Sequence, residues 1–272
     1  MKHALPNSQP LTTARLSLHL QEQANSAAAI STHEHLRFQL DHALARDAVH
    51  AALDVPLLER GLHACGFTPL TLRSAARDRK EYLRRPDLGR TLHPTSIEAL
   101  KSATNWGKNL GAPCPLPSGT RDAIPRDASE SRIAFILADG LSALALERHA
   151  LPLLDATLPL ITSHSSLITV VTNARVALAD HIGQLLNAQL TVLFIGERPG
   201  LSSPDSLGVY LTWQPRPGRT DAERNCISNI RAEGLSYAEA AHRIAHYIAE
   251  ARRLQTTGIA LKDPATVPRL TQ

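Results

Sequence analysis

The chain has 272 residues, of which 43% are hydrophobic, and a formal net charge of +4. We find neither a long uncharged apolar stretch nor a signal-peptide pattern, so we expect a soluble, cytoplasmic protein and no membrane span. Acidic residues interrupt even the densest basic stretch, residues 73–90, which argues against nucleic-acid binding. Cys65, Cys114 and Cys226 are far apart, so neither a zinc ribbon nor a disulfide scaffold is expected.

The first half of the chain is predicted to be mainly helical. Apolar residues recur at helical spacing from about Thr32 to Leu62, and Thr95 or Ser96 can cap a short helix that ends at Gly107 or Gly111. Between them lies a short apolar piece, residues 69–72. Residues 111–131 are rich in proline and poor in periodic apolar residues, so we place a domain boundary there, between residues 115 and 116.

The second half alternates apolar runs with helical patterns. The runs at 132–140, 166–171, 190–196 and 207–215 are strand candidates, and residues 141–158, 175–188 and 236–254 have helical spacing. Ser236 and Glu239 form a capping-box pattern at the start of the last helix. Uninterrupted apolar strands that alternate with helices predict an α/β fold with a mostly parallel sheet covered on both faces.

Two loops follow strands of this sheet, where ligands of α/β folds bind. Asp139, Gly140 and Ser142 form "DGLS" after the first run, and they fit either a ligand contact or a tight turn with a helix cap. The loop at 196–201 places Glu197 and Arg198 at the mouth of a buried strand, between glycines and a proline. This second loop fits either a structural turn or a polar rim for a ligand.

The usual catalytic and metal-binding motifs are missing from the sequence. It contains no GxGxxG, GxxxxGK[ST], GxSxG or DxHxxG motif, and in the helical pair His242 and His246 the position after the first histidine is Arg243 instead of glutamate. Cys226 lies in a segment that we interpret as a polar loop, with no obvious histidine base near it in sequence. We therefore predict no catalytic residue and no metal ligand in this chain.

Five stretches resemble the small subunit (light chain) of ethanolamine ammonia-lyase: "ARDAVHAALD", "DRKEYLRRPDLGR", "ADGLS", "IGERPGLSSPDSLG" and "AERNCISNIR". They occur in the order of that family, across residues 12–263, and the pairing of GERPG with CISNI is specific to it. The resemblance implies a helical N-terminal region, 1–115, that packs on the large subunit, followed by a Rossmann-like cobalamin-binding domain, 116–272.

The resemblance also implies a function. The small subunit, inactive alone, helps to hold adenosylcobalamin, base-on at its cobalt, against a large subunit that converts ethanolamine to acetaldehyde and ammonia by a radical mechanism, in a higher hetero-oligomer. Its cofactor-binding positions correspond here to Val176, Glu197 and Cys226. Some members carry a longer N-terminal extension associated with bacterial microcompartments, so residence there or in the plain cytosol stays open. A stand-alone α/β enzyme that uses Cys226 and a non-catalytic subunit of another complex are the alternatives.

Overall fold

A computed structural model of the chain describes residues 31–107, 132–161 and 167–261. The chain forms two compact units, residues 1–43 and 44–272, and the helix α2 (Thr32–His50) continues from the first into the second. The single helix predicted from Thr32 to Leu62 is wrong, because two helices occupy this stretch and the second is α3 (Val55–Ala64). Asp54 caps the start of α3, since its side chain accepts a hydrogen bond from Leu57 N at 2.9 Å. The expected domain boundary at residues 115 and 116 lies outside the described residues.

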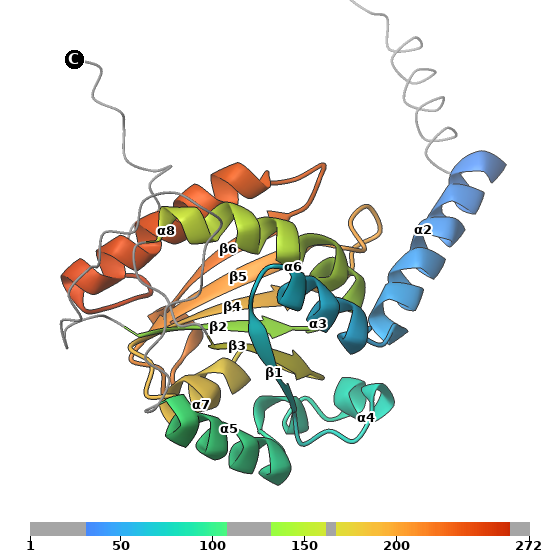
Figure 1. The fold of residues 1–272 in the computed structure, drawn as a ribbon. Coiled ribbons are helices and arrows are strands. Elements are labelled where there is room, and N and C mark those ends of the chain that lie inside the picture. Colours follow the sequence, from blue (N-terminus) through green and yellow to red (C-terminus); the bar gives the residue numbers. More distant parts are fainter. Residues whose placement is uncertain (1–30, 108–131, 162–166, 262–272) are drawn as a thin grey trace, which may run out of the picture. The chain divides into compact units, whose positions relative to one another are not determined.

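The second unit is built on one six-stranded sheet in the order β1-β3-β2-β4-β5-β6 (Figure 1). The strands are β1 (Thr68–Arg73), β2 (Ile133–Ala138), β3 (Leu167–Thr172), β4 (Leu190–Gly196), β5 (Leu207–Trp213) and β6 (Arg224–Ile230). Strands β1 to β4 are parallel to one another, whereas β5 is antiparallel to both of its neighbours. The predicted α/β class is thus confirmed.

Three parts of the sequence-based prediction need correction or stay unconfirmed. The sheet is mixed, because β5 runs antiparallel to both of its neighbours whereas β6 has the same direction as β1 to β4, and the Rossmann-like description is not confirmed. The predicted polar loop around Cys226 is strand β6. It escaped recognition because it buries only some of its side chains and therefore lacks an apolar run. The apolar piece near residue 70 forms β1, so the N-terminal half also contributes a strand.

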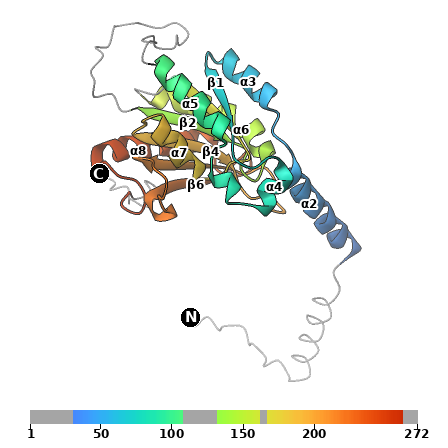
Figure 2. The same cartoon turned by 90° about the horizontal axis from the view of Figure 1, so that it is seen from below.

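Helices cover the sheet on two faces (Figures 1 and 2). Helices α3, α6 (Ala143–Thr157) and α8 (Tyr237–Leu254) pack on the face that carries Phe135 and Phe194, while α5 (Pro94–Gly107) and α7 (Leu178–Leu185) pack on the face of Ile136 and Leu193. Successive strand residues point to opposite faces, so burial on both sides explains the unbroken apolar runs of β2 and β4. No helix among the described residues is long and apolar enough to cross a membrane.

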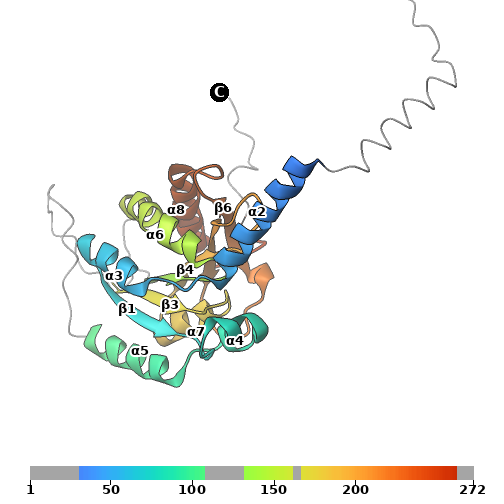
Figure 3. The same cartoon turned by 90° about the vertical axis from the view of Figure 1, so that its right-hand side faces the viewer.

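The topology brings five strand ends together. Strands β1 to β4 end on one side of the sheet, and the register pairs Gly196 with Leu207 and Leu207 with Ile230, so β6 ends there as well. We call this side the carboxyl edge. The short helix α4 (Arg79–Arg84) lies beyond these strand ends (Figure 3). The remaining described elements are the 3₁₀ turns η1 (Leu88–Arg90), η2 (Leu158–Leu160) and η3 (Asp221–Glu223).

A buried ion pair fixes β6 at its other end. The Arg224 guanidinium, at the start of β6, donates to the Asp180 carboxylate of α7, and both side chains are nearly inaccessible. Arg224 also donates to Arg219 O at 2.9 Å and to Asp221 Oδ1 at 3.1 Å. Burial raises the pKa of Asp180, to about 6, against the lowering effect of Arg224. The pair therefore joins the antiparallel hairpin to the helix layer of the parallel strands.

We predict that Arg224→Met destabilises the protein by about 3–5 kcal/mol at pH 8, because it leaves the Asp180 carboxylate buried without its hydrogen-bonded partner. A raised pKa in the folded state means that the native protein binds the proton more tightly than the unfolded chain. The loss should therefore shrink as the pH falls from above 6 toward 4. Denaturant unfolding at several pH values measures this. Arg253→Met, which removes an exposed partner of Glu250, is the control and should cost under about 1 kcal/mol. A pH-independent loss for Arg224→Met would contradict the argument.

Candidate functional site

The "DGLS" loop at the end of β2 is a turn and a helix cap. Ser142 caps α6, since its Oγ accepts from Ala145 N at 3.2 Å. Gly140 has a φ of 55°, which glycine adopts without strain. Asp139 is buried, with 2% of its surface exposed. The structural interpretation of this loop is confirmed, and Ser142 and Asp139 are occupied by the fold itself.

Asp139 lies between the ends of β2 and β3, at the place where a doubly wound sheet usually binds its ligand. The connection after β2 runs to α6 on one face and the connection after β3 runs to α7 on the other, which makes this the topological switch point. Asp139 spans it by accepting from Asn173 N at 2.9 Å and Ala174 N at 3.2 Å. Arg79 of α4 then fills the opening, with Nη1 at 3.2 Å from Asp139 Oδ2 and 2.7 Å from Gly140 O. Asp139 and Arg79 thus occupy the switch point itself.

The loop after β4 is anchored through one oxygen of Glu197. Glu197 N donates to Ser206 O at 2.9 Å, so the loop closes on itself. The Glu197 Oε2 atom accepts from Ser206 Oγ and, at 3.2 Å, from Asn229 N at the end of β6. Within the described part of the chain no hydrogen bond reaches the other oxygen, Oε1. One oxygen of this partly buried carboxylate therefore holds the loop in place, and the other oxygen can accept a hydrogen bond from a ligand.

Helix α6 and strand β6 hold the rest of this loop. Ser142 Oγ donates to Pro204 O at 2.8 Å, and Arg231 Nη1 donates to Ser202 O at 3.4 Å. Arg148 Nη1 lies 2.8 Å from Asp205 Oδ2. Although burial opposes ionisation, Arg148 and His149 together lower the pKa of Asp205, which keeps its carboxylate charged at neutral pH. Little ordering remains to be done when a ligand meets this loop.

Glu197 shares one face of the β5–β6 hairpin with Tyr210 and Cys226. A Cβ built on Gly208 would lie 2.9 Å from Glu197 Oε1, so the carboxylate lies directly over this glycine. Tyr210 follows two residues later on the same face, directly opposite Cys226 in the register, so the phenol and the thiol lie side by side. Cys226 and Ser228 are exposed on this face. The structure thus brings Glu197 and Cys226 together around Tyr210.

The electrostatics of this face do not suit nucleophilic catalysis. Surrounding protein atoms desolvate the Cys226 thiol and raise its pKa, and the Glu197 and Asp221 carboxylates raise it further. Burial is the main cause that raises the pKa of the Tyr210 phenol, and the nearby Cys226 and Glu197 side chains raise it further. A protonated thiol is a poor nucleophile, so Cys226 is suited to packing or a weak polar contact.

A bulge in β6 directs a backbone donor at Glu197. The register slips between Leu207 and Val209, and Asn229 adopts a left-handed φ of 60°, which asparagine tolerates better than most residues. Its N–H can then reach Glu197 Oε2. Sequence reasoning missed Ser206, Gly208 and Asn229. Two signals in the sequence could have indicated this irregularity: Gly208 inside a strand pattern, and Asn229 just before the last residue of a strand.

Val176 packs against the same apolar cluster as Tyr210. It precedes α7 at the carboxyl edge and is half-buried against a cluster that includes Leu178, Ile182 and Ile195, against which Tyr210 also packs. Val176 therefore belongs to the same side of the sheet as the other two predicted positions. The structure gives it an apolar contact surface and no polar function.

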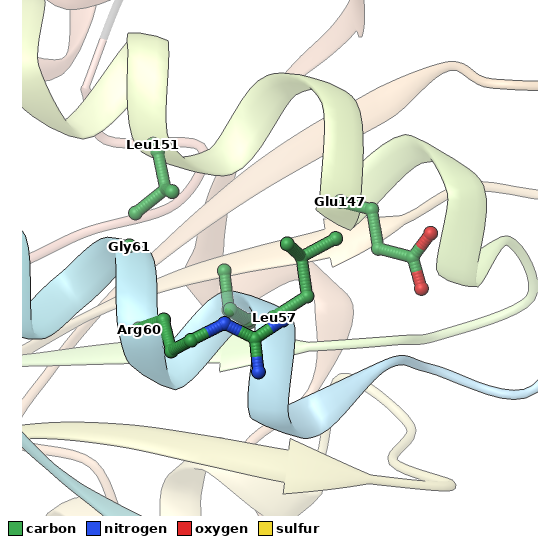
Figure 4. A pocket seen from close by; sticks show the side chains of 6 residues that line it. Leu57, Arg60, Gly61, Glu147 and Leu151 are labelled. Atoms are coloured by element: carbon green, nitrogen blue, oxygen red, sulfur yellow. The ribbon is translucent and has the colours of Figure 1, made fainter.

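A separate cavity of about 370 Å³ lies between α3 and α6 (Figure 4). Leucines line it, among them Leu57 and Leu151, together with Arg60 and Glu147. Glu147 Oε1 already accepts from Asp54 N at 2.7 Å. Its few polar groups do not converge, so we place the candidate site at Glu197 instead. No group of three or more His, Cys, Asp or Glu side chains in the described ranges could hold a metal ion.

The same site lies within a sequence that matches known proteins over nearly its whole length. Residues 3–262 match the family model "Ethanolamine ammonia-lyase light chain (EutC)". The chain is 49% identical to the ethanolamine ammonia-lyase small subunit of Azotobacter vinelandii over 263 residues, 96% of this chain and 88% of the relative. It is 47% identical to that of Bradyrhizobium diazoefficiens over 256 residues, 93% and 87% of the two chains. The protein belongs to the ethanolamine ammonia-lyase small-subunit family.

Proposed function

We propose that this chain holds one side of adenosylcobalamin, base-on, against a large catalytic subunit, and itself supplies no group to the reaction. Adenosylcobalamin, when bound, supplies the radical chemistry by which a lyase of this family would convert ethanolamine to acetaldehyde and ammonia. The observation that carries the proposal is the Glu197 carboxylate over Gly208, with Oε2 anchored and Oε1 free. An acceptor at the open face of a sheet suits the amide N–H donors at the corrin edge.

The other proposed contacts fit the same arrangement. Cys226 presents a small, protonated side chain on the exposed face beside Tyr210, and Val176 adds apolar surface at the carboxyl edge. A rigid loop and an open sheet face suit a large, flat ligand covered from the other side by a partner. We therefore assign Val176, Glu197 and Cys226 to cofactor binding and propose that the large subunit completes the site, within a higher hetero-oligomer.

The N-terminal basic stretch offers a surface for that partner. Within residues 73–90, Arg79 and Tyr82 point into the fold, whereas Arg77, Arg84 and Arg85 are exposed. Arginine is favoured at protein interfaces. We propose that the outward face of α4 and of the turn that follows it contacts the large subunit.

Reconstitution tests the function. Ethanolamine deamination is measured with this chain alone, with a large subunit alone, and with both in the presence of adenosylcobalamin. We expect activity only from the mixture. Turnover by this chain alone that disappears in Cys226→Ala would instead support a stand-alone cysteine enzyme. A mixture without activity or cobalamin binding would indicate an interaction subunit of another complex.

We predict that Glu197→Gln raises the half-saturating adenosylcobalamin concentration by about 5- to 150-fold, corresponding to about 1–3 kcal/mol. The amide oxygen can take over the hydrogen bonds from Ser206 and Asn229, but the amide nitrogen then replaces the free acceptor Oε1. The apo stability should therefore be retained. Glu197→Ala loses both functions, so it should weaken cobalamin binding and also lower the thermal stability of the free chain. Cofactor titration and thermal unfolding separate the two effects.

Gly208→Ala provides a matched test of the geometry. The three atoms nearest to an added Cβ all belong to the flexible Glu197 side chain, with Oε1 at 2.9 Å and Cγ at 3.1 Å, so the chain should fold while the carboxylate is displaced. Weaker cobalamin binding is expected here too. Unchanged half-saturation in both Glu197→Gln and Gly208→Ala would overturn the cofactor role and leave Glu197 as a loop anchor.

We predict that cobalamin protects Cys226 from alkylation. The reconstituted complex is treated with iodoacetamide with and without adenosylcobalamin, and peptide mass spectrometry follows each cysteine. Cys226 modification should slow when the cofactor is bound, because the corrin would cover this face of β6. Cys65, exposed at the end of α3, is the internal control and should not respond to the cofactor. Equal Cys226 rates in both samples would argue against a contact.

A further inference from the structure

A tyrosine at the carboxyl edge makes cation–π contacts with two guanidinium groups. Tyr82 of α4 is fully buried, and its hydroxyl donates to Ala174 O at 2.9 Å. The Arg79 Cζ atom lies 5.0 Å from the centre of its ring and the Arg175 Cζ atom 4.6 Å from it. Arg175 is also fixed through its backbone, because its N–H donates to Gly89 O at 2.8 Å. Both cations are therefore held in defined positions by the fold.

The charges of this cluster do not balance. Asp139 lies 3.2 Å from Arg79, whereas no carboxylate of the described residues pairs with Arg175. Tyr82 adds no negative charge, because burial raises the pKa of its phenol. The Nε–H of Arg175 and an Nη2–H of Arg79 are buried and have no acceptor within the described part of the chain. Leaving such donors unpaired is costly, so this place is suited to an anion.

The cluster lies beside the proposed cofactor contacts. Arg175 directly precedes Val176 after β3. In the sheet order β3-β2-β4, the ends of β3 and β4 are two strand spacings apart, about 10 Å at roughly 4.8 Å each. That span is within the size of a base-on cobalamin. The corrin side chains are neutral amides, and the phosphodiester of the nucleotide loop is the anionic group among them.

We propose that Arg175, supported by the buried Arg79–Tyr82 pair, binds the phosphodiester of the cobalamin nucleotide loop. This inference rests on the proposed function and adds a specific contact to it. A planar guanidinium matches phosphate oxygens with two parallel N–H donors, which an ammonium does not. The cation–π contact with Tyr82 restrains the Arg175 guanidinium before the ligand arrives, so less conformational entropy is lost on binding.

The test compares corrinoids with and without the phosphate. Equilibrium binding to the reconstituted complex is measured by absorbance for adenosylcobalamin, adenosylcobinamide phosphate and adenosylcobinamide. Arg175→Gln should weaken binding of the two phosphate-containing ligands by roughly 10- to 150-fold and leave adenosylcobinamide binding unchanged. Arg175→Lys keeps the charge without the planar fork, so its loss should be smaller and again confined to the phosphate ligands. Arg253→Gln, at an exposed position on α8, is the control and should change none of the affinities.

The outcomes separate this inference from the function on which it rests. If the wild-type complex does not bind adenosylcobalamin, the proposed function fails. If the wild type binds it and Arg175→Gln weakens all three corrinoids equally, or none, only the phosphodiester contact is overturned. A weaker association of the two subunits in Arg175→Gln without any corrinoid would show that a carboxylate of the partner is the anion, and would also overturn it. Thermal unfolding of each free variant checks that it is folded. If Arg175→Gln is not folded, the comparison is made with Arg175→Lys instead.

Discussion

The buried Asp139 carboxylate organises the carboxyl edge of the sheet. It follows β2, accepts from the backbone of the β3 loop, and is neutralised by Arg79 of α4. Three segments far apart in the sequence therefore meet on one charged group. Removing either partner would leave an uncompensated buried charge, so α4 cannot leave the switch point without a large loss of stability. The switch point of the sheet is thereby occupied by an internal ion pair, and the adjacent antiparallel hairpin keeps an open face.

The hairpin β5–β6 carries the site because it is fixed at both ends and open on one face. At its far end Arg224 is buried against Asp180, and at the carboxyl edge the Glu197 carboxylate receives the backbone N–H of Asn229. Between these anchors, β6 leaves Cys226 and Ser228 exposed. An exposed, rigid sheet face with few polar groups is unsuited to enclose a small substrate, but it can support one side of a large, flat cofactor.

The groups at this candidate site are suited to binding and positioning a ligand, and none of those described is activated for chemistry. The Cys226 thiol and the Tyr210 phenol have raised pKa values and stay protonated at neutral pH. Glu197 offers an acceptor and Arg175 a cation, both held by their own neighbours. This character agrees with membership in the small-subunit family of a lyase.

The sequence alone determined the strands that are buried on both faces, since β2 and β4 need apolar side chains at every position, and it determined the cap of α8 by Ser236. It also singled out Glu197 and Cys226, through the resemblance of GERPG and CISNI to one family. Only the tertiary structure showed that Asp139 forms an internal ion pair and that Cys226 lies on a strand. It also showed that one oxygen of Glu197 anchors the loop while the other is left as a free acceptor. Local spacing describes what a segment buries, but it does not say which distant residue will satisfy a charge. Arg79 and Asp139 are sixty positions apart, and they meet because β1 and β2 are parallel and end on the same side of the sheet.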